Sequence, residues 1–295
     1  MLTDTSAVAA APITEDQPSN VGETVASLFG GRFSDTVDQV VGGTSQNTFV
    51  GIAIVANGSE ASKGAWQYHN GSGWVDIGSA STNAAVLLNA GTSVRFAPAQ
   101  DFSGQAPTLT VHLVESGGPG FTDGTTANLS SGNVGGATRY SADTLVLNQF
   151  VTPVNEAPSI TLPSEPAVSE NAVNVALADT IHITDVDGDP QTVTLTAMGG
   201  TVSVSATNDL LFSGGSDGTN DGTMIFSGSL DNVNAALDSL TFTPTPNTPG
   251  PASIQIATND GKTGTDSDTL SFTIQGGPSC CIDHAGEPGW RGHER

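Results

Sequence analysis

Apolar and polar residues alternate with a period of two in many short segments of this 295-residue chain. Half-buried β-strands produce this pattern, because successive side chains point to opposite faces of a sheet. Turn-forming pairs such as Asn70-Gly71 and Asp217-Gly218 separate the segments. Short strands at this spacing predict β-sandwiches. The predicted strands are Gly51–Val55, Thr108–Val114, Leu145–Leu147, Val173–Leu177, Thr192–Thr196, Thr201–Ser205, Ser253–Ala257 and Leu270–Ile274.

Four features recur in the same order in each half of the chain, which predicts two tandem copies of one plan. We expect domain 1 over residues 13–153, domain 2 over residues 154–275, an N-terminal extension over residues 1–12 and a disordered tail over residues 276–295. The recurring features are an acid after an apolar residue (Ile13–Glu15, Val168–Glu170), an aspartate-bearing loop (Ser34–Asp38, Thr184–Asp189), a strand ending in proline (Val94–Pro98, Leu240–Pro244) and an Asp-Thr-Leu triplet (Asp143–Leu145, Asp268–Leu270).

Two local patterns refine this plan. Pro153 and Pro158 bracket the boundary between the domains, so a short, stiff and extended joint is expected there. In Ser229–Leu240 the apolar residues fall at helical spacing behind a potential N-cap serine. We interpret this segment as a short crossover helix that closes the second sandwich.

The two ends of the chain carry little fold information. Cys280 and Cys281 are adjacent, so they cannot form a scaffold disulfide between distant parts of the chain. No segment approaches the length of a membrane span, and we expect no direct membrane insertion. The start of the chain lacks a basic signal-peptide region, which favours a fragment or a secretion route without a cleaved N-terminal signal.

The charge balance narrows the range of partners. The chain has seven Lys and Arg residues and 30 Asp and Glu residues, which gives a formal net charge of −23. Nucleic-acid binding needs clustered basic residues, so it is not expected. The acidic surface instead attracts cations. A merely soluble acidic domain remains the alternative.

The segment Asp185–Asp189 places three carboxylates at alternate positions, with Gly188 allowing a sharp turn between them. Calcium prefers six to eight oxygen ligands, and carboxylates supply them well. The loop is not an EF-hand, because that motif needs glycine where this chain has Pro190 and glutamate where it has Thr196. The alternative is that these acids only cap turns and solvate the loop.

Three elements of domain 2 resemble the cadherin-like domains of large bacterial adhesins and related repeat-in-toxin (RTX) surface proteins. They are Ser169-Glu170-Asn171, Asp185-Val186-Asp187 and the joint Val154-Asn155-Glu156-Ala157-Pro158. Leu230–Pro244 is similar to repeats in such adhesins, and Gly64–Trp74 of domain 1 resembles a companion repeat. The resemblance implies an all-β fold of two tandem cadherin-like (immunoglobulin-like) β-sandwich domains.

The resemblance also implies a function and a set of ligands. Calcium would stiffen the joint of a spacer module in an extracellular or bacterial cell-surface adhesin, with neighbouring repeat domains of the same polypeptide as partners. Domain 1 departs from the pattern, because Asp35 and Asp38 are spaced DxxD rather than DxD. Glu170 and Asp260 are expected to face a following domain. The implied ligands at the joint are Glu15, Asn155, Glu156, Asp185 and Asp187, with Asp189 completing the aspartate loop.

Two other functions compete with this one. Trp66, Tyr68 and Trp74 could stack on a cell-surface glycan or contact a protein, although a hairpin with cross-strand packing is the alternative for them. Gly214–Gly218 matches the Gly-x-Ser-x-Gly pattern of hydrolases, but a polar turn follows it where that motif needs a helix. We therefore expect no enzyme and no catalytic residues.

Overall fold

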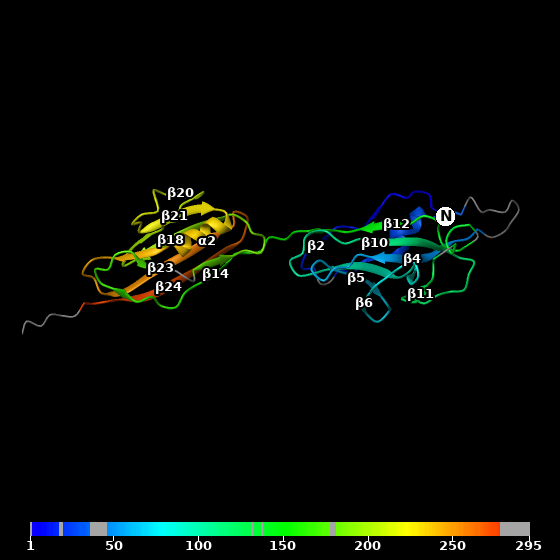
Figure 1. Cartoon of the computed structure of the whole chain (residues 1–295), viewed down its shortest axis with the longest axis horizontal. Coiled ribbons are helices and arrows are strands. Elements are labelled where there is room, and N and C mark those ends of the chain that lie inside the picture. The colour runs from blue at the N-terminus through cyan, green and yellow to red at the C-terminus, as the bar shows by residue number, and fades with distance from the viewer. Residues whose placement is uncertain are drawn as a thin grey trace, which may run out of the picture. The chain divides into compact units, whose positions relative to one another are not determined.

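The computed structural model describes residues 2–17, 20–35, 46–130, 132–136, 138–177 and 181–277. The chain divides into two compact units, Met1–Val154 and Asn155–Arg295. Their regular secondary structure is almost entirely β-strand, which confirms the all-β fold class with tandem sandwich domains (Figure 1). Asp38 and the predicted tail from residue 278 onward lie outside the described residues.

Unit 1 contains two larger sheets that face one another across a shared core. The first has the strand order β1-β12-β10-β4-β7-β11, the second the order β3-β8-β5-β6, and a small third sheet the order β2-β13-β9. The strands are β1 (Val8–Ala9), β2 (Ile13–Thr14), β3 (Glu23–Thr24), β4 (Phe49–Asn57), β5 (Gly64–His69), β6 (Trp74–Asp76), β7 (Ala85–Asn89), β8 (Ser93–Pro98), β9 (Gly104–Gln105), β10 (Leu109–Glu115), β11 (Thr126–Ala127), β12 (Leu145–Asn148) and β13 (Phe150–Thr152).

The core of unit 1 contains side chains from both larger sheets, including Ile52, Trp66 and Phe96, all of them buried. The other face of the first sheet also packs against apolar side chains. There Leu87 and Leu129 form a second, smaller cluster with neighbouring residues. One sheet of unit 1 is therefore covered on both faces.

Two details of unit 1 differ from the sequence expectation. Residues 1–12, which the repeat pattern placed outside domain 1, include β1, and β1 pairs in parallel with β12. A short helix, α1 (Val25–Phe29), followed by the 3-10 turn η1 (Gly30–Arg32), was not predicted. Thr24 is the N-cap of α1, because its hydroxyl accepts a hydrogen bond from the Ser27 N–H.

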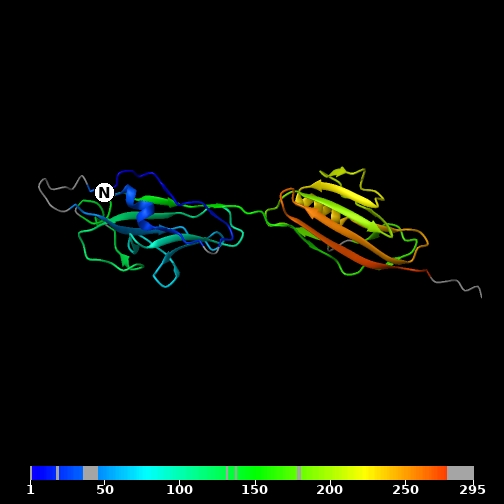
Figure 2. The same cartoon turned by 180° about the vertical axis from the view of Figure 1, so that it is seen from behind.

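Unit 2 has one long sheet of order β15-β24-β23-β18-β21-β20, a sheet of order β16-β22-β19 and the pair β14-β17. Strands β23 and β24 pair in antiparallel fashion from Gly250↔Ile274 to Asn259↔Thr265, as the orange strands in Figure 2 show. The strands are β14 (Ser159–Thr161), β15 (Val168–Ser169), β16 (Val175–Ala176), β17 (His182–Thr184), β18 (Gln191–Met198), β19 (Gly200–Ser203), β20 (Leu211–Ser213), β21 (Thr223–Gly228), β22 (Thr241–Pro244), β23 (Gly250–Asn259) and β24 (Thr265–Gln275).

The predicted crossover helix is confirmed as α2 (Leu230–Asp238), between β21 and β22 (Figure 1). The Ser229 hydroxyl caps it by accepting a hydrogen bond from the Asn232 N–H. Val233 and Leu237 on its inner face are buried in the same core as the long sheet. The helix therefore closes the sandwich, as its apolar spacing predicted.

Candidate metal centre

The aspartate loop follows directly from β17, whose central residue Ile183 is buried in the core of unit 2. The first carboxylate turns the chain, because Asp185 Oδ1 accepts a hydrogen bond from the Asp187 N–H at 3.0 Å. Gly188 follows with φ of 69°, the left-handed region that favours glycine. A rigid strand and a locally hydrogen-bonded turn therefore position the loop.

The three aspartates converge as the alternate spacing predicted. Asp185, Asp187 and Asp189 each offer an oxygen, and these oxygens all lie within 4.8 Å of one another. A side-chain amide supports the group, because Gln191 Nε2 donates to Asp185 Oδ2 at 2.7 Å. Carboxylates this close repel one another unless a cation lies between or beside them. Their hard oxygen donors suit calcium.

The first residues of unit 2, Asn155 and Glu156, are hydrogen-bonded to aspartates at this end of the sandwich. The Glu156 N–H donates to Asp187 Oδ2 at 3.0 Å. Asn155 Nδ2 donates to Asp260 Oδ2 at 2.7 Å. Among the described residues, the enclosed Oδ1 of Asn155 has no hydrogen-bond partner. A side-chain carbonyl oxygen in this state is a suitable calcium ligand, so the donor set fits the ion.

Asp260 is buried and densely hydrogen-bonded in the turn between β23 and β24. It accepts hydrogen bonds from the backbone N–H groups of Lys262 and Gly264 as well as from Asn155. The pKa of Asp260 lies below its usual value, chiefly because Asn155 donates to its charged form, and burial opposes this only in part. A side chain at position 264 would clash with this carboxylate, so glycine is needed there.

The positively charged side chain of Lys262 lies beside these aspartates. Its Nζ lies 2.7 Å from Asp189 Oδ2. The pKa of Lys262 is raised, first by this contact and then by the charges of Asp189, Asp187 and Asp260. Sequence reasoning missed Lys262. The available signal was a rare basic residue two positions after an aspartate in a turn.

One predicted placement is wrong. Asp260 was expected to share an end of domain 2 with Glu170, but it lies beside Asn155, where the domain begins. Glu170 lies at the far end of β24, because its N–H donates to the Gln275 carbonyl and its Oε1 accepts from the Gly277 N–H. The length of β24 separates these two ends, about 30 Å at the usual rise of a strand.

Two acids of unit 1, Glu15 and Asp35, accept hydrogen bonds from backbone N–H groups of the same unit. Glu15 is buried and accepts a hydrogen bond from the N–H of Val154, the last residue of that unit. Asp35 Oδ2 accepts a hydrogen bond from the Asn47 N–H at 2.6 Å. Both carboxylates therefore hold backbone groups in place.

The three aromatic residues proposed for ligand binding do not share a surface. They lie in or beside the predicted hairpin, in which His69 pairs with Trp74. Trp66 is buried, stacks edge-on with Phe96 and donates its Nε1–H to the Pro107 carbonyl. It offers no ring face to a ligand. Tyr68 is half-buried and packs against the core on the same side of β5.

Trp74 lies on the opposite face, half-buried, with the Arg95 guanidinium 4.2 Å from its ring centroid. Gln67 joins this stack to a carboxylate, because it accepts from Arg95 Nε at 2.9 Å and donates to Asp76 at 2.8 Å. On this outer face of β5, β6 and β8, Trp74 therefore lies within a polar network and also makes an edge-to-face ring contact with His69.

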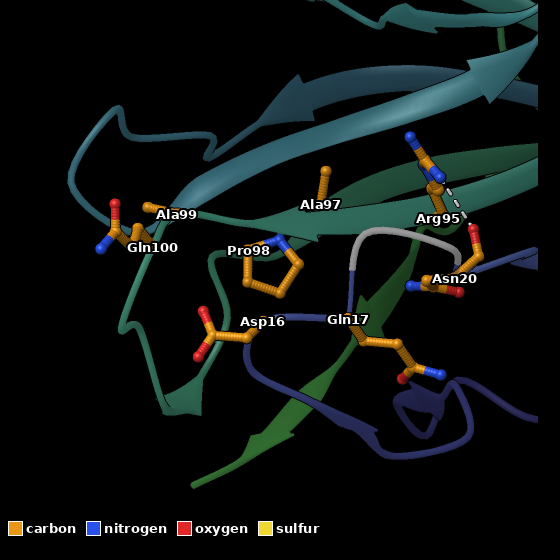
Figure 3. A pocket seen from close by; sticks show the side chains of 8 residues that line it. All are labelled: Asp16, Gln17, Asn20, Arg95, Ala97, Pro98, Ala99 and Gln100. Carbon is orange, nitrogen blue, oxygen red and sulfur yellow. Dashed lines mark hydrogen bonds between the residues drawn. The ribbon is translucent and has the colours of Figure 1, made fainter. Parts of the chain in front are cut away.

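A cavity of about 420 Å³ lies beside Arg95, and no sequence pattern indicated it. In Figure 3, Arg95 donates to the Asn20 carbonyl at 2.8 Å on one side of this cavity. Pro98, the last residue of β8, and Gln100 line the side away from Arg95, and Asp16 lies on that same side (Figure 3). Polar and apolar side chains both line this cavity, and Asp16 is the single carboxylate among the described lining residues.

The serine of the hydrolase-like pattern, Ser216, lies between the antiparallel strands β20 and β21. Its hydroxyl donates to the Thr223 carbonyl and accepts from the Ile225 N–H. A nucleophile elbow places its serine between a strand and a helix. Ser216 therefore closes a hairpin.

No protein-family model matches the chain, and no curated protein matches it. Among solved structures it is similar to EC1-2 of human mucin-like protocadherin, with 14% identity, TM-score 0.33, and coverage of 77% of this chain and 98% of the other. It is also similar to EC21-23 of human CDH23, with 11% identity, TM-score 0.39, and coverage of 91% and 66%.

A third similar structure holds extracellular cadherin domains 3-6 of protocadherin gamma B2, with 12% identity and TM-score 0.40. The alignment covers 94% of this chain and 52% of that one, so this chain spans about half of its length. Likenesses this weak assign no function to this chain. Among the described residues, no helix has the length and apolarity that a membrane crossing requires.

Proposed function

We propose that this chain is an extracellular adhesion module whose second domain binds calcium, and that the ion stiffens the joint between the two domains. The observation that carries the proposal is the convergence of three aspartate oxygens within 4.8 Å at the end of unit 2 where the joint enters. Asp185, Asp187 and Asp189 would hold the ion.

Asn155, Glu156 and Asp260 complete the proposed ligand set. The support for Asn155 is its Oδ1, which has no hydrogen-bond partner among the described residues. Glu156 is included because its own N–H contacts Asp187, which keeps it beside the loop. The net charge of −23 favours cation binding throughout the chain.

The proposed stiffening of the joint is based on where the ligands Asn155 and Glu156 lie along the chain. Asn155 and Glu156 are the first residues of unit 2, and Glu15 holds the N–H of Val154 directly before them. An ion that takes ligands from the joint and from the Asp185–Asp189 loop removes freedom from the joint. On this proposal Glu15 supplies a ligand from domain 1. Glu170 serves a corresponding joint to a following repeat of a bacterial surface or secreted adhesin.

Calcium titration of the full chain tests this function. Isothermal titration calorimetry is expected to show binding that EDTA reverses, together with a rise in the melting temperature of domain 2. A ligand that binds only the folded state stabilises it by about 2.7 kcal/mol at one hundred times its Kd. Heat and melting curves that are the same in calcium and in EDTA would reject the proposal.

A second candidate function is recognition of a glycan or protein by the outer face of β5, β6 and β8. The specific observation in its favour is Trp74, which is stacked on Arg95 within a polar network rather than in the core. Trp66 and Tyr68 do not belong to this face. Binding on a glycan array that disappears on Trp74→Ala would support this candidate, whereas an array with no ligand counts against it.

A further inference from the structure

Lys262 is one of only seven Lys and Arg residues in the chain, and it lies directly against the aspartate loop. Its side chain reaches Asp189, with Nζ 2.7 Å from Oδ2. Its backbone is fixed to the same centre, because the Lys262 N–H donates to Asp260 Oδ1 at 2.7 Å. Two carboxylates of the proposed calcium centre therefore hold this residue, one at each end.

The position of Lys262 makes it a local counter-ion. Besides Asp189, the charges of Asp187 and Asp260 also attract its ammonium group. Three aspartate oxygens within 4.8 Å repel one another, and one positive charge beside them offsets part of that repulsion. The side chain is nevertheless 53% exposed, against 17% for Asp189. Its ammonium group can therefore move into water without disturbing the core.

We propose that Lys262 is a tethered counter-cation, which neutralises Asp189 in the metal-free protein and competes with calcium for that carboxylate. This inference rests on the proposed function. A calcium ion bound by Asp189 lies about 2.3–2.6 Å from its oxygen. An ammonium group on the same oxygen would then be repelled by the double charge, so calcium binding releases Lys262 to solvent.

Two consequences follow from this exchange. The metal-free loop keeps a compact form, because a positive charge is always within reach of the three carboxylates. Calcium must displace that charge, so the centre fills at a higher calcium concentration than it would without Lys262. Lys262 thus sets the calcium threshold at which the joint becomes stiff.

The test compares Lys262→Gln with the unaltered full chain by calorimetric titration with calcium chloride. The glutamine variant is expected to bind calcium about 3- to 10-fold more tightly, because one repelling charge is gone. In EDTA its melting temperature is expected to fall by about 1–2 °C, the range for a lost exposed ion pair. Lys262→Arg keeps the charge and should retain the unaltered affinity.

The chain offers a matched control in Lys63, which forms an exposed ion pair with Glu60 at 3.1 Å in unit 1. Lys63→Gln makes the same charge change away from the aspartates and should leave calcium affinity unchanged. Equal or weaker calcium binding by Lys262→Gln would overturn the inference while leaving the proposed function intact. If neither the unaltered chain nor the variant binds calcium, the proposed function and the competition are both rejected.

Discussion

Asp187 is the residue whose charge matters most to the proposed centre, because it belongs to the aspartate group and also accepts the Glu156 N–H. Asp187→Asn keeps an oxygen for that hydrogen bond and removes only the charge. We expect the calcium-induced rise in melting temperature to disappear, and stability in EDTA to change by less than about 0.5 kcal/mol. Scanning calorimetry with and without calcium measures both effects.

Asp268→Asn is the control for this prediction. Asp268 is exposed on β24 in the same domain, and the substitution changes the net charge by the same amount. It should respond to calcium as the unaltered chain does. A calcium response that persists in Asp187→Asn, or that disappears in both variants, would contradict a specific role for Asp187.

The two tryptophans of domain 1 are expected to differ sharply. Trp66 is buried with its Nε1–H bonded to Pro107, so Trp66→Ala should cost about 3–5 kcal/mol of unfolding free energy. Trp74 contributes a stack with Arg95 on the outer face, and Trp74→Ala should cost about 1 kcal/mol. Urea unfolding of both variants measures the difference. Similar losses would show that the two rings have equivalent packing.

At the scale of the elements, helix α2 supports the strand that leads into the aspartate loop. The buried side chain of Asn234 on α2 accepts from the Ile183 N–H and donates to the Ile183 carbonyl, both at 2.9 Å. Asn234→Ala leaves these buried backbone groups of β17 without partners, a cost of about 1–3 kcal/mol. Calcium affinity should fall as well, because Ile183 precedes Asp185 by two residues.

Ser229→Ala provides the comparison for that variant. It removes the N-cap of the same helix at a cost of about 1 kcal/mol, and the hydrogen bond that is lost joins Ser229 to Asn232 within the helix. Calorimetric titration should therefore find calcium affinity reduced for Asn234→Ala and unchanged for Ser229→Ala. Equal affinities in the two variants would show that α2 does not position the loop.

Elements with a strong local pattern could be predicted from the sequence. The spacing of Val233 and Leu237 predicted α2, and period-two alternation predicted strands at β18, β23 and β24. Between Val173 and Leu177, by contrast, the strand β16 comprises only Val175–Ala176. Strand length depends on a partner, and β22 pairs with β16 at these two residues only.

The aspartate group was predictable because its spacing is local to one loop. The location of Asp260 was not, because it depends on which ends of β23, β24 and β14 lie together. The antiparallel pairing of β23 and β24 places the turn after Asn259 at one end of the hairpin. A hydrogen bond from Ile160 of β14 to Asp266 of β24 brings that end to the start of the domain, and a single sequence does not reveal this long-range contact. Lys262 was missed for the same reason, since its contact with Asp189 joins residues 73 positions apart.

At the scale of the whole molecule, calcium is expected to restrict the joint between the two domains. Small-angle X-ray scattering of the full chain should show a narrower distribution of interatomic distances in calcium than in EDTA, because a bridging ion removes orientations of the joint. Glu15→Gln separates bridging from binding, since Glu15 belongs to unit 1 and the aspartate loop to unit 2. This variant should keep most of the calcium-dependent stabilisation of domain 2 but lose the narrowing. If it retains the full narrowing, the ion stiffens the joint through Asn155 and Glu156 alone, and the proposed ligand from domain 1 is wrong.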